Sequence, residues 1–276
     1  MNNVVVRSIS GVVFILAMLA CLMFNKFLFA GLIIFIMSVM LLEFYHITMG
    51  NSYTFSKVLA IIAAIFLFGL LFATASYHIP IRFVAFAMVP IFIVMINSLY
   101  VKDKDEYGKF SNIYTGLLYI AVPIALSNLI AFDKAGNFSG NLLLCFFIII
   151  WCSDVGAFAF GISLGKIFPQ KLFPSVSPKK TWIGFIGGLV SSVLAAFALS
   201  VFGILKFPLI HCLILSFIMS VTGVYGDLFE SQWKRVYGVK DSGKIIPGHG
   251  GFLDRFDSTL MAMPFGAIYL AIFDLL

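Results

Sequence analysis

Long apolar segments alternate with short polar stretches along the whole chain. A helix that spans a membrane needs about 20 mainly apolar residues, and nine segments reach or approach that length. The pattern therefore predicts an all-α polytopic integral membrane protein with about nine transmembrane helices. The expected spans are residues 8–24, 27–45, 57–76, 83–100, 111–132, 141–164, 183–205, 208–229 and 256–274.

The first two segments are separated by little more than Asn25 and Lys26, which predicts a tight helical hairpin. An eight-span count results if this hairpin is re-entrant. Arg7, followed by an apolar stretch to Phe24, also resembles a signal peptide. We expect a spanning segment instead, because more spans follow and we see no soluble domain for a signal peptide to export.

The composition excludes a water-soluble globular protein. Hydrophobic residues make up 62% of the chain and charged residues only 11%, whereas a soluble domain carries roughly 25% charged residues. We expect an N-terminal transmembrane region of about five spans at residues 1–135. A C-terminal transmembrane region at residues 136–276 then carries the catalytic candidates, with a polar segment at 231–257.

The 18 basic residues exceed the 12 acidic ones, which gives a net charge of +6. In membrane proteins Lys and Arg concentrate in cytoplasmic loops. With nine spans and a cytoplasmic N-terminus, the basic residues left on the opposite side are Lys26, Arg82, Lys134 and Lys206. This distribution predicts that the two longest polar loops, near 165–182 and 230–255, lie on the cytoplasmic face of the inner (cytoplasmic) membrane.

A few carboxylates lie in or at the ends of apolar segments, where an ionised group is costly unless it is paired or bound to a metal. They are Glu43, Asp154, Asp227 and Glu230. We place Glu43 outside the site, because a carboxylate followed by Tyr45 is typical of a span that ends at the interface. Asp227 is the strongest candidate, because a polar segment rich in Asp, Gly, Lys and Arg follows it.

The segment after Asp227 contains the parts of a site for a phosphorylated, strongly anionic substrate. Asp254 and Asp257 are three residues apart at the start of the last span, so both carboxylates can project from one helical face. Together with Asp227 they are expected to bind one or two divalent cations through oxygen ligands, as Mg²⁺ requires. Gly250 and Gly251 permit the close backbone approach that phosphate-binding loops need. The countercharge is expected from Lys234, Arg235, Lys240, Lys244 and Arg255.

Three other residues complete the candidate chemistry. Lys179 and Lys180 precede a glycine-rich helix start, which favours phosphate binding over a general attraction to anionic lipids. His249 either fixes the glycine turn by hydrogen bonding or contacts the nucleotide or a phosphate.

The polar segment has a regular order of motifs. It reads Ser231, two residues, Lys-Arg, four residues, Lys-Asp, then Pro-x-His-Gly-Gly and Asp-Arg-x-Asp, ending at Asp257. This run resembles the signature of phosphatidate cytidylyltransferases, also called CDP-diacylglycerol synthases. The upstream run Ser177-Pro178-Lys179-Lys180-Thr181 is similar to the second motif of that family. The resemblance covers the chain from residue 150 to the end, whereas the first 130 residues match only as a stack of spans.

The resemblance implies a reaction in which CTP and phosphatidic acid give CDP-diacylglycerol and pyrophosphate. It also implies Mg²⁺ as cofactor, with a monovalent cation as an option, and a homodimer in the lipid bilayer; no nucleic-acid partner is expected. The catalytic residues would be Asp227, Asp254, Asp257, Lys234 and Arg235, with the three aspartates as metal ligands. The substrate-binding and phosphate-binding residues would be Ser177, Lys179, Lys180, Lys240, Lys244, His249, Gly250, Gly251 and Arg255.

Two positions depart from the family pattern. Ile183 stands where the family commonly has Glu, and Trp233 stands where an aliphatic residue, Met or Phe is usual.

The alternative functions are those of another CTP-dependent lipid enzyme, such as a polyprenol kinase or a CDP-archaeol-type synthase, and of a cation-coupled transporter. Transport is disfavoured, because the acidic residues cluster at one end of the spans rather than near the membrane midplane.

Overall fold

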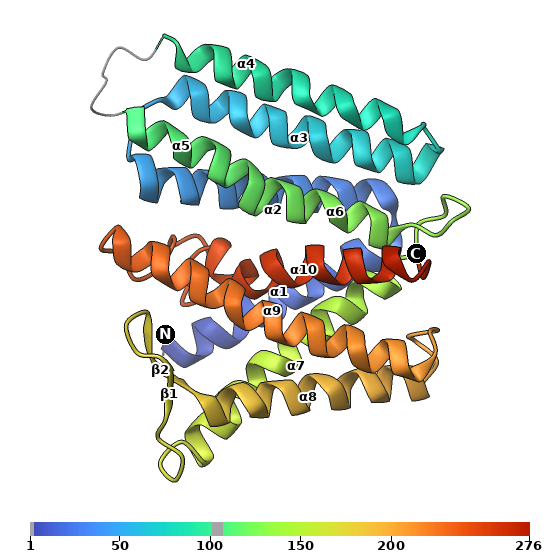
Figure 1. Cartoon of the computed structure of the whole chain (residues 1–276), viewed down its shortest axis with the longest axis vertical. Helices are drawn as coiled ribbons and strands as arrows, with labels where there is room; N and C mark the ends of the chain where they lie inside the picture. The colour runs from blue at the N-terminus through green and yellow to red at the C-terminus, as the bar shows by residue number, and fades with distance from the viewer. Residues whose placement is uncertain (1–2, 101–106) are drawn as a thin grey trace. The chain divides into compact units, whose positions relative to one another are not determined.

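The computed structural model describes residues 3–100 and 107–276 (Figure 1). Every expected span is helical in this part of the chain, which confirms the predicted all-α polytopic membrane fold. Seven of the helical segments described are long and apolar enough to cross a membrane. The apolar part of the first helix, Ile9–Phe24, is shorter, and the last helix is not among the seven. Lys102 and Lys104, which the charge distribution assigns to the cytoplasmic side, lie outside the described residues.

The chain divides into two compact units. The first unit contains Met1–Ser139 together with Asp241–Arg255, and the second contains Gly140–Lys240 together with Phe256–Leu276. The segment Asp241–Arg255, which carries much of the polar signature, thus belongs to the same unit as the N-terminal helices.

The first unit is built from helices that follow one another closely along the chain. They are α1 (Asn3–Phe24), α2 (Lys26–Met49), α3 (Thr54–Tyr77), the 3₁₀ segment η1 (Ile81–Ala87), α4 (Met88–Ser98), α5 (Tyr107–Gly116), the π-helical segment η2 (Leu117–Ala121) and α6 (Val122–Ala131). The expected hairpin between the first two spans turns at Asn25, whose side chain accepts a hydrogen bond of 2.7 Å from the Phe27 backbone N–H. α3 packs beside both α4 and α6 (Figure 1).

The second unit consists of long helices and a short hairpin. Its elements are α7 (Asn141–Ser163), β1 (Lys171–Phe173), β2 (Ser177–Thr181), α8 (Trp182–Val201), α9 (Leu209–Val236) and, from Phe256 onward, α10 (Leu253–Ile272). The prediction that a polar loop begins near residue 230 is wrong, because α9 continues as a helix to Val236. Glu230 and Lys234, one turn apart, form an ion pair along this last part of the helix.

Small residues let α7 and α8 pack closely. A Cβ added to Gly156 would lie 2.1 Å from Ser191 Oγ and 2.8 Å from the carbonyl oxygen of Gly187. A Cβ added to Gly187 would lie 2.3 Å from the ring of Phe160. Such small-residue contacts are a main source of helix association in membranes, where burial of apolar surface between helices is a weak driving force.

Replacing Gly156 by leucine is therefore expected to destabilise the second unit. The new side chain has no space at the α7–α8 contact, and overpacking of this kind costs about 1–3 kcal/mol or more. The same substitution at Gly69 in α3, where nothing lies within 4 Å of an added Cβ, serves as the control. Thermal unfolding in detergent should show a lower Tm for Gly156→Leu and an unchanged Tm for Gly69→Leu. Equal Tm values would contradict the close packing.

Candidate functional site

The polar loop expected near 165–182 contains a β-hairpin that sequence reasoning did not predict. β1 and β2 pair in antiparallel fashion, with Lys171 opposite Thr181 and Phe173 opposite Ser177. Thr181 then caps α8: its Oγ1 accepts a hydrogen bond of 3.2 Å from the Gly184 N–H. The hairpin and the cap together place Lys179 and Lys180 directly before the start of α8.

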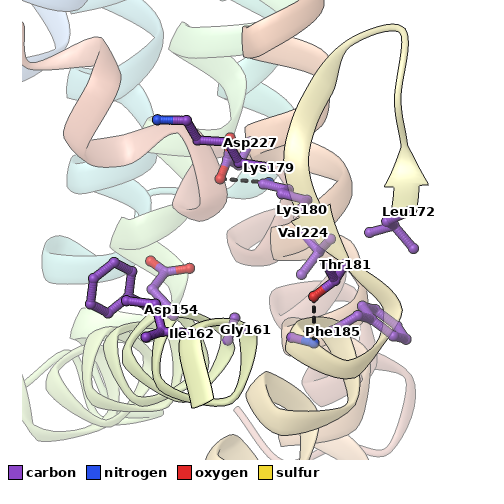
Figure 2. Close-up of a pocket in the computed structure, with 13 residues that line it drawn as sticks. Asp154, Gly161, Ile162, Leu172, Lys179, Lys180, Thr181, Phe185, Val224 and Asp227 are labelled. Atoms are coloured by element: carbon purple, nitrogen blue, oxygen red, sulfur yellow. Dashed lines mark hydrogen bonds and ion pairs between the residues drawn. The ribbon is translucent and has the colours of Figure 1, made fainter. Parts of the chain in front are cut away.

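A cavity of about 500 Å³ lies in the second unit, between the hairpin and helices α7, α8 and α9 (Figure 2). Its polar lining consists of Asp154, Lys179, Lys180, Thr181 and Asp227. The rest is mainly apolar and includes Phe158, Ile162, Leu172, Phe185 and Val224. The cavity therefore combines charged groups suited to an anion with a surface suited to hydrocarbon.

An ion pair joins the hairpin to α9 within this cavity. Lys180 Nζ lies 2.6 Å from Asp227 Oδ2, and the two side chains are 26% and 31% exposed. Asp227 also accepts a hydrogen bond of 3.3 Å from Ser231 Oγ, one turn further along α9. Figure 2 shows Asp154 projecting from α7 and the Lys180–Asp227 pair lying between the hairpin and α9.

Several carboxylates gather around the start of the last helix in the second unit. Asp257 interacts electrostatically with Asp227, Glu230 and Asp154. Ser258 links two of them: its backbone N–H donates to Asp257 Oδ1 at 2.6 Å, and its Oγ donates to Asp154 Oδ1 at 3.4 Å. Concentrated negative charge of this kind attracts cations.

A glycine makes this gathering possible. A Cβ added to Gly226 would lie 2.5 Å from the carbonyl oxygen of Asp257, so α9 and α10 approach each other closely beside Asp227. Any larger residue at this position would push the two helices apart.

The segment Asp241–Arg255 of the first unit, which we call the signature loop, is organised around two carboxylates. Asp254 Oδ2 accepts hydrogen bonds from the Ser242 N–H at 2.9 Å, from Ser242 Oγ at 2.9 Å and from the Gly251 N–H at 2.8 Å. Glu43 of α2 reaches the same loop: its Oε2 accepts from Ser242 Oγ at 3.1 Å and from the Leu253 N–H at 2.9 Å. Its Oε1 accepts from the Phe252 N–H at 3.1 Å.

His249 of the signature loop is held by α1. Ser10 Oγ lies 2.9 Å from His249 Nδ1 and donates a hydrogen bond of 2.9 Å to the Pro247 carbonyl oxygen. A Cβ added to Gly11 would lie 3.5 Å from the imidazole, which is ordinary contact distance. Of the two interpretations of His249, the structure therefore provides the hydrogen bond, and contact with a nucleotide stays a prediction.

The sequence profile described as the cytidylyltransferase family matches residues 5–273. The chain belongs to the cytidylyltransferase family. It is 41% identical over 182 residues to the phosphatidate cytidylyltransferase of Bacillus subtilis strain 168, an alignment that covers 65% of this chain and 63% of the relative. It is 45% identical over 124 residues to the phosphatidate cytidylyltransferase of Staphylococcus saprophyticus, covering 45% of this chain and 46% of the relative. The chain thus spans about half to under two thirds of the length of these relatives.

Three of the site residues expected from the sequence line the cavity of the second unit. They are Lys179, Lys180 and Asp227. Other expected residues belong to the same unit but do not line that cavity. They are Ser177 at the start of β2, Lys234 and Arg235 in the last turn of α9, Lys240 after it, and Asp257 in α10. The remaining ones belong to the signature loop: Lys244, His249, Gly250, Gly251, Asp254 and Arg255.

The three aspartates expected as metal ligands are divided between the units, with Asp254 in the first and Asp227 and Asp257 in the second. Among the described residues, no group of three or more His, Cys, Asp or Glu side chains is placed to hold a metal ion. The three-aspartate metal site therefore stays a prediction.

Sequence reasoning missed two residues that hold the signature loop, Glu43 and Ser10. The sequence pattern placed Glu43 at the membrane interface and outside the site. In the structure Glu43 is 6% exposed and accepts a hydrogen bond from the Leu253 N–H of the loop. The signal was present in the sequence, because a carboxylate inside an apolar span requires a partner. Ser10 carried no comparable signal, since a lone serine in a span usually bonds to its own helix.

Proposed function

We propose that the protein transfers CMP from CTP to phosphatidic acid, which gives CDP-diacylglycerol and pyrophosphate for phospholipid biosynthesis. The observation that carries this proposal is the cavity of the second unit, where two lysines and two aspartates adjoin an apolar lining. A lipid with a phosphate headgroup suits this lining, because its anionic phosphate can contact the lysines and its hydrocarbon part can contact the apolar residues. The family match and the names of the relatives support this choice over the kinase and transporter alternatives.

The proposed reaction joins two anions. A phosphate oxygen of phosphatidic acid attacks the α-phosphorus of CTP, the bond from that phosphorus to the bridging oxygen breaks, and pyrophosphate leaves with the bonding electrons. The attacking oxygen is already ionised near neutral pH, so no strong general base is required. The protein must instead hold two negatively charged groups in line, which is a task for fixed positive charge and orientation.

We assign the lipid phosphate to the lysines of the hairpin. Lys179 and Lys180 line the cavity, and Lys180 is held in place by Asp227. Phe158, Ile162 and Phe185 provide apolar surface for the glycerol backbone and the first carbons of the acyl chains. The triphosphate of CTP is assigned to the basic residues of the signature loop, Lys244 and Arg255, both of which are exposed.

We further propose Mg²⁺ as the cofactor. The donors suit this ion, because Asp257 lies among carboxylates that include Asp227, and Mg²⁺ prefers hard oxygen ligands. Asp227 and Asp257, which belong to the same unit, would hold the ion. When bound, Mg²⁺ would neutralise charge on the triphosphate. The aspartates also orient the neighbouring groups without it, as Asp227 does for Lys180.

Product analysis tests the proposed function. The purified protein in detergent should convert phosphatidic acid and CTP to CDP-diacylglycerol with an equal amount of pyrophosphate, identified by mass spectrometry of the lipid fraction. Conversion of a polyprenol to its phosphate, with no reaction of phosphatidic acid, would show that the protein is a kinase. Cation flux through reconstituted vesicles without either product would favour the transporter.

The proposed orientation places the N-terminus, the hairpin and the signature loop in the cytoplasm, where CTP is available. A cysteine introduced at Lys240 is then expected to react with a membrane-impermeant maleimide only after permeabilisation. A cysteine introduced at Lys134, in the exposed turn before α7, should react in intact spheroplasts. The parent protein gives the background from its own cysteines, three of which are buried. Labelling of both sites from the same side would overturn the orientation.

A further inference from the structure

Glu43 is an acidic residue within the apolar helix α2, and the residue is only 6% exposed. Burying an ionised carboxylate is costly unless hydrogen bonds replace the lost water. Three donors of the signature loop do so here: the N–H groups of Phe252 and Leu253 and the hydroxyl of Ser242. The Leu253 contact joins positions 210 residues apart in the sequence.

Two of these donors lie at the start of α10, which begins at Leu253. The first N–H groups of a helix have no partner within the helix, and a carboxylate there is stabilised by the helix dipole as well. Such a cap normally comes from a residue next to the helix in sequence. In this protein the cap comes from α2, so the start of α10 is fixed to the N-terminal helices of the first unit.

The glycines of the signature loop make room for this contact. A Cβ added to Gly243 would lie 2.5 Å from Glu43 Oε1, and one added to Gly251 would lie 2.5 Å from both carboxylate oxygens of Glu43. Gly250 has φ +86°, and an added Cβ would lie 2.6 Å from Asp254 Oδ2. The three glycines form the space into which the two carboxylates fit, and two of them, Gly250 and Gly251, are those expected to bind phosphate.

Ser242 connects the two carboxylates. Its hydroxyl lies 3.1 Å from Glu43 Oε2 and 2.9 Å from Asp254 Oδ2. Loss of the Glu43 carboxylate would remove one of the two carboxylates that hold the Ser242 hydroxyl, and would leave the N–H groups of Phe252 and Leu253 without their acceptor. The loop that carries Asp254 and His249 would then be less firmly held. Glu43 is therefore placed to act on these residues indirectly.

We infer that Glu43 is a positioning residue that holds the signature loop in the arrangement that binds the nucleotide. This inference rests on the proposed function, because the loop carries the groups assigned to CTP. It assigns to the N-terminal helices a part in the reaction beyond that of a membrane anchor. The inference also predicts different effects on the two substrates. A change at Glu43 should raise the KM for CTP, because the residues assigned to CTP lie in the loop, and should leave the KM for phosphatidic acid unchanged.

The test compares Glu43→Gln with the wild type by two measurements. The KM for CTP is expected to rise about 10-fold or more, as for the loss of a hydrogen bond to a charged group, while the KM for phosphatidic acid stays unchanged. Amide hydrogen exchange of the protein without nucleotide should become faster at Phe252 and Leu253 and stay the same in α8. A loss of folded protein alone would lower the active fraction and leave both KM values unchanged.

Tyr45→Phe is the matched control. Tyr45 lies on the same helix, is buried and donates a hydrogen bond of 3.0 Å to the Ile113 carbonyl oxygen, away from the signature loop. This variant should leave the KM for CTP and the exchange of the loop unchanged. If Glu43→Gln folds poorly, Ser242→Ala provides the second variant, because it removes the hydroxyl that joins Glu43 to Asp254. It should raise the KM for CTP in the same way.

The inference is overturned if an active wild type and Glu43→Gln share the same KM for CTP and the same exchange at Phe252 and Leu253. If the wild type does not produce CDP-diacylglycerol, the proposed function fails instead. Hydrogen exchange still decides in that case whether Glu43 holds the loop, so the two failures are distinguishable.

Discussion

Replacing Asp227 by asparagine is expected to lower kcat by about 10³-fold, which corresponds to about 4 kcal/mol of transition-state stabilisation. Asparagine has nearly the same shape but lacks the charge that pairs with Lys180 and adds to the carboxylates around Asp257. The loss should therefore affect the orientation of the lysine and the attraction of a cation at the same time. Steady-state kinetics in detergent, with the KM for each substrate, measures the effect.

Glu230→Gln is the matched control for this substitution. Glu230 lies one turn further along α9, is 2% exposed and pairs with Lys234, but it does not line the cavity. Its neutralisation also removes one of the carboxylates around Asp257, but it leaves the Lys180–Asp227 pair in place, so kcat is expected to change by less than about 10-fold. Equal losses in Asp227→Asn and Glu230→Gln, at equal Tm, would mean that Asp227 has no special part in the reaction.

Removing both lysine charges from the cavity should produce the second large effect. The double variant Lys179→Gln, Lys180→Gln is expected to lower kcat/KM for phosphatidic acid by about 10²-fold, because each charged hydrogen bond to a phosphate contributes about 1.5–3 kcal/mol. The KM for CTP should change less, since its phosphates are assigned to the signature loop. Initial rates at varied concentrations of each substrate separate the two effects.

Lys171→Gln provides the comparison within the same hairpin. Lys171 is exposed on β1 and pairs in register with Thr181, but it does not line the cavity. The substitution removes one positive charge from the same hairpin, and so controls for a general attraction of the protein to anionic lipid. Wild-type activity in the double variant, or an equal loss in Lys171→Gln, would remove the lysines from the proposed site.

The spans could be predicted from the sequence because their length and apolar character follow directly from the thickness of the bilayer. The turn at Asn25 was also predictable, because Asn25 and Lys26 are the polar residues that separate the first two apolar segments. The family could be recognised from the polar motifs alone, because the order of Lys, Asp, Gly and His across the signature is specific. The profile match over residues 5–273 confirms it.

The β-hairpin could not be predicted, because Ser177–Thr181 contains a proline and two lysines and lacks the alternation that marks a strand. The two strands are joined by a turn in which the Val176 N–H donates to the Phe173 carbonyl oxygen at 3.2 Å. Pro174 favours such a turn, but a turn alone does not predict a strand on each side of it. The extension of α9 to Val236 was hidden for a related reason: the residues after Phe229 are polar, and hydropathy alone cannot show that Glu230 and Lys234 pair along a helix.

The contacts of Glu43 and Asp254 depend on tertiary structure. A carboxylate in an apolar span indicates that a partner exists, but not which residue it is, and the partner Leu253 lies 210 positions away. Asp254 was expected as a metal ligand, and its Oδ2 accepts three hydrogen bonds from Ser242 and Gly251. Its role toward a metal stays a prediction, since hydrogen bonds to one oxygen leave the other available.

The position of the phosphorus that reaches the lipid is the most direct test of the proposed reaction. The purified protein would be given phosphatidic acid with CTP labelled at the α-phosphorus in one reaction and at the γ-phosphorus in another. Cytidylyl transfer predicts that the α-label enters the lipid fraction, whereas the γ-label stays in water as pyrophosphate. A lipid that carries the γ-label and lacks the α-label would contradict it, because that pattern means phosphoryl transfer.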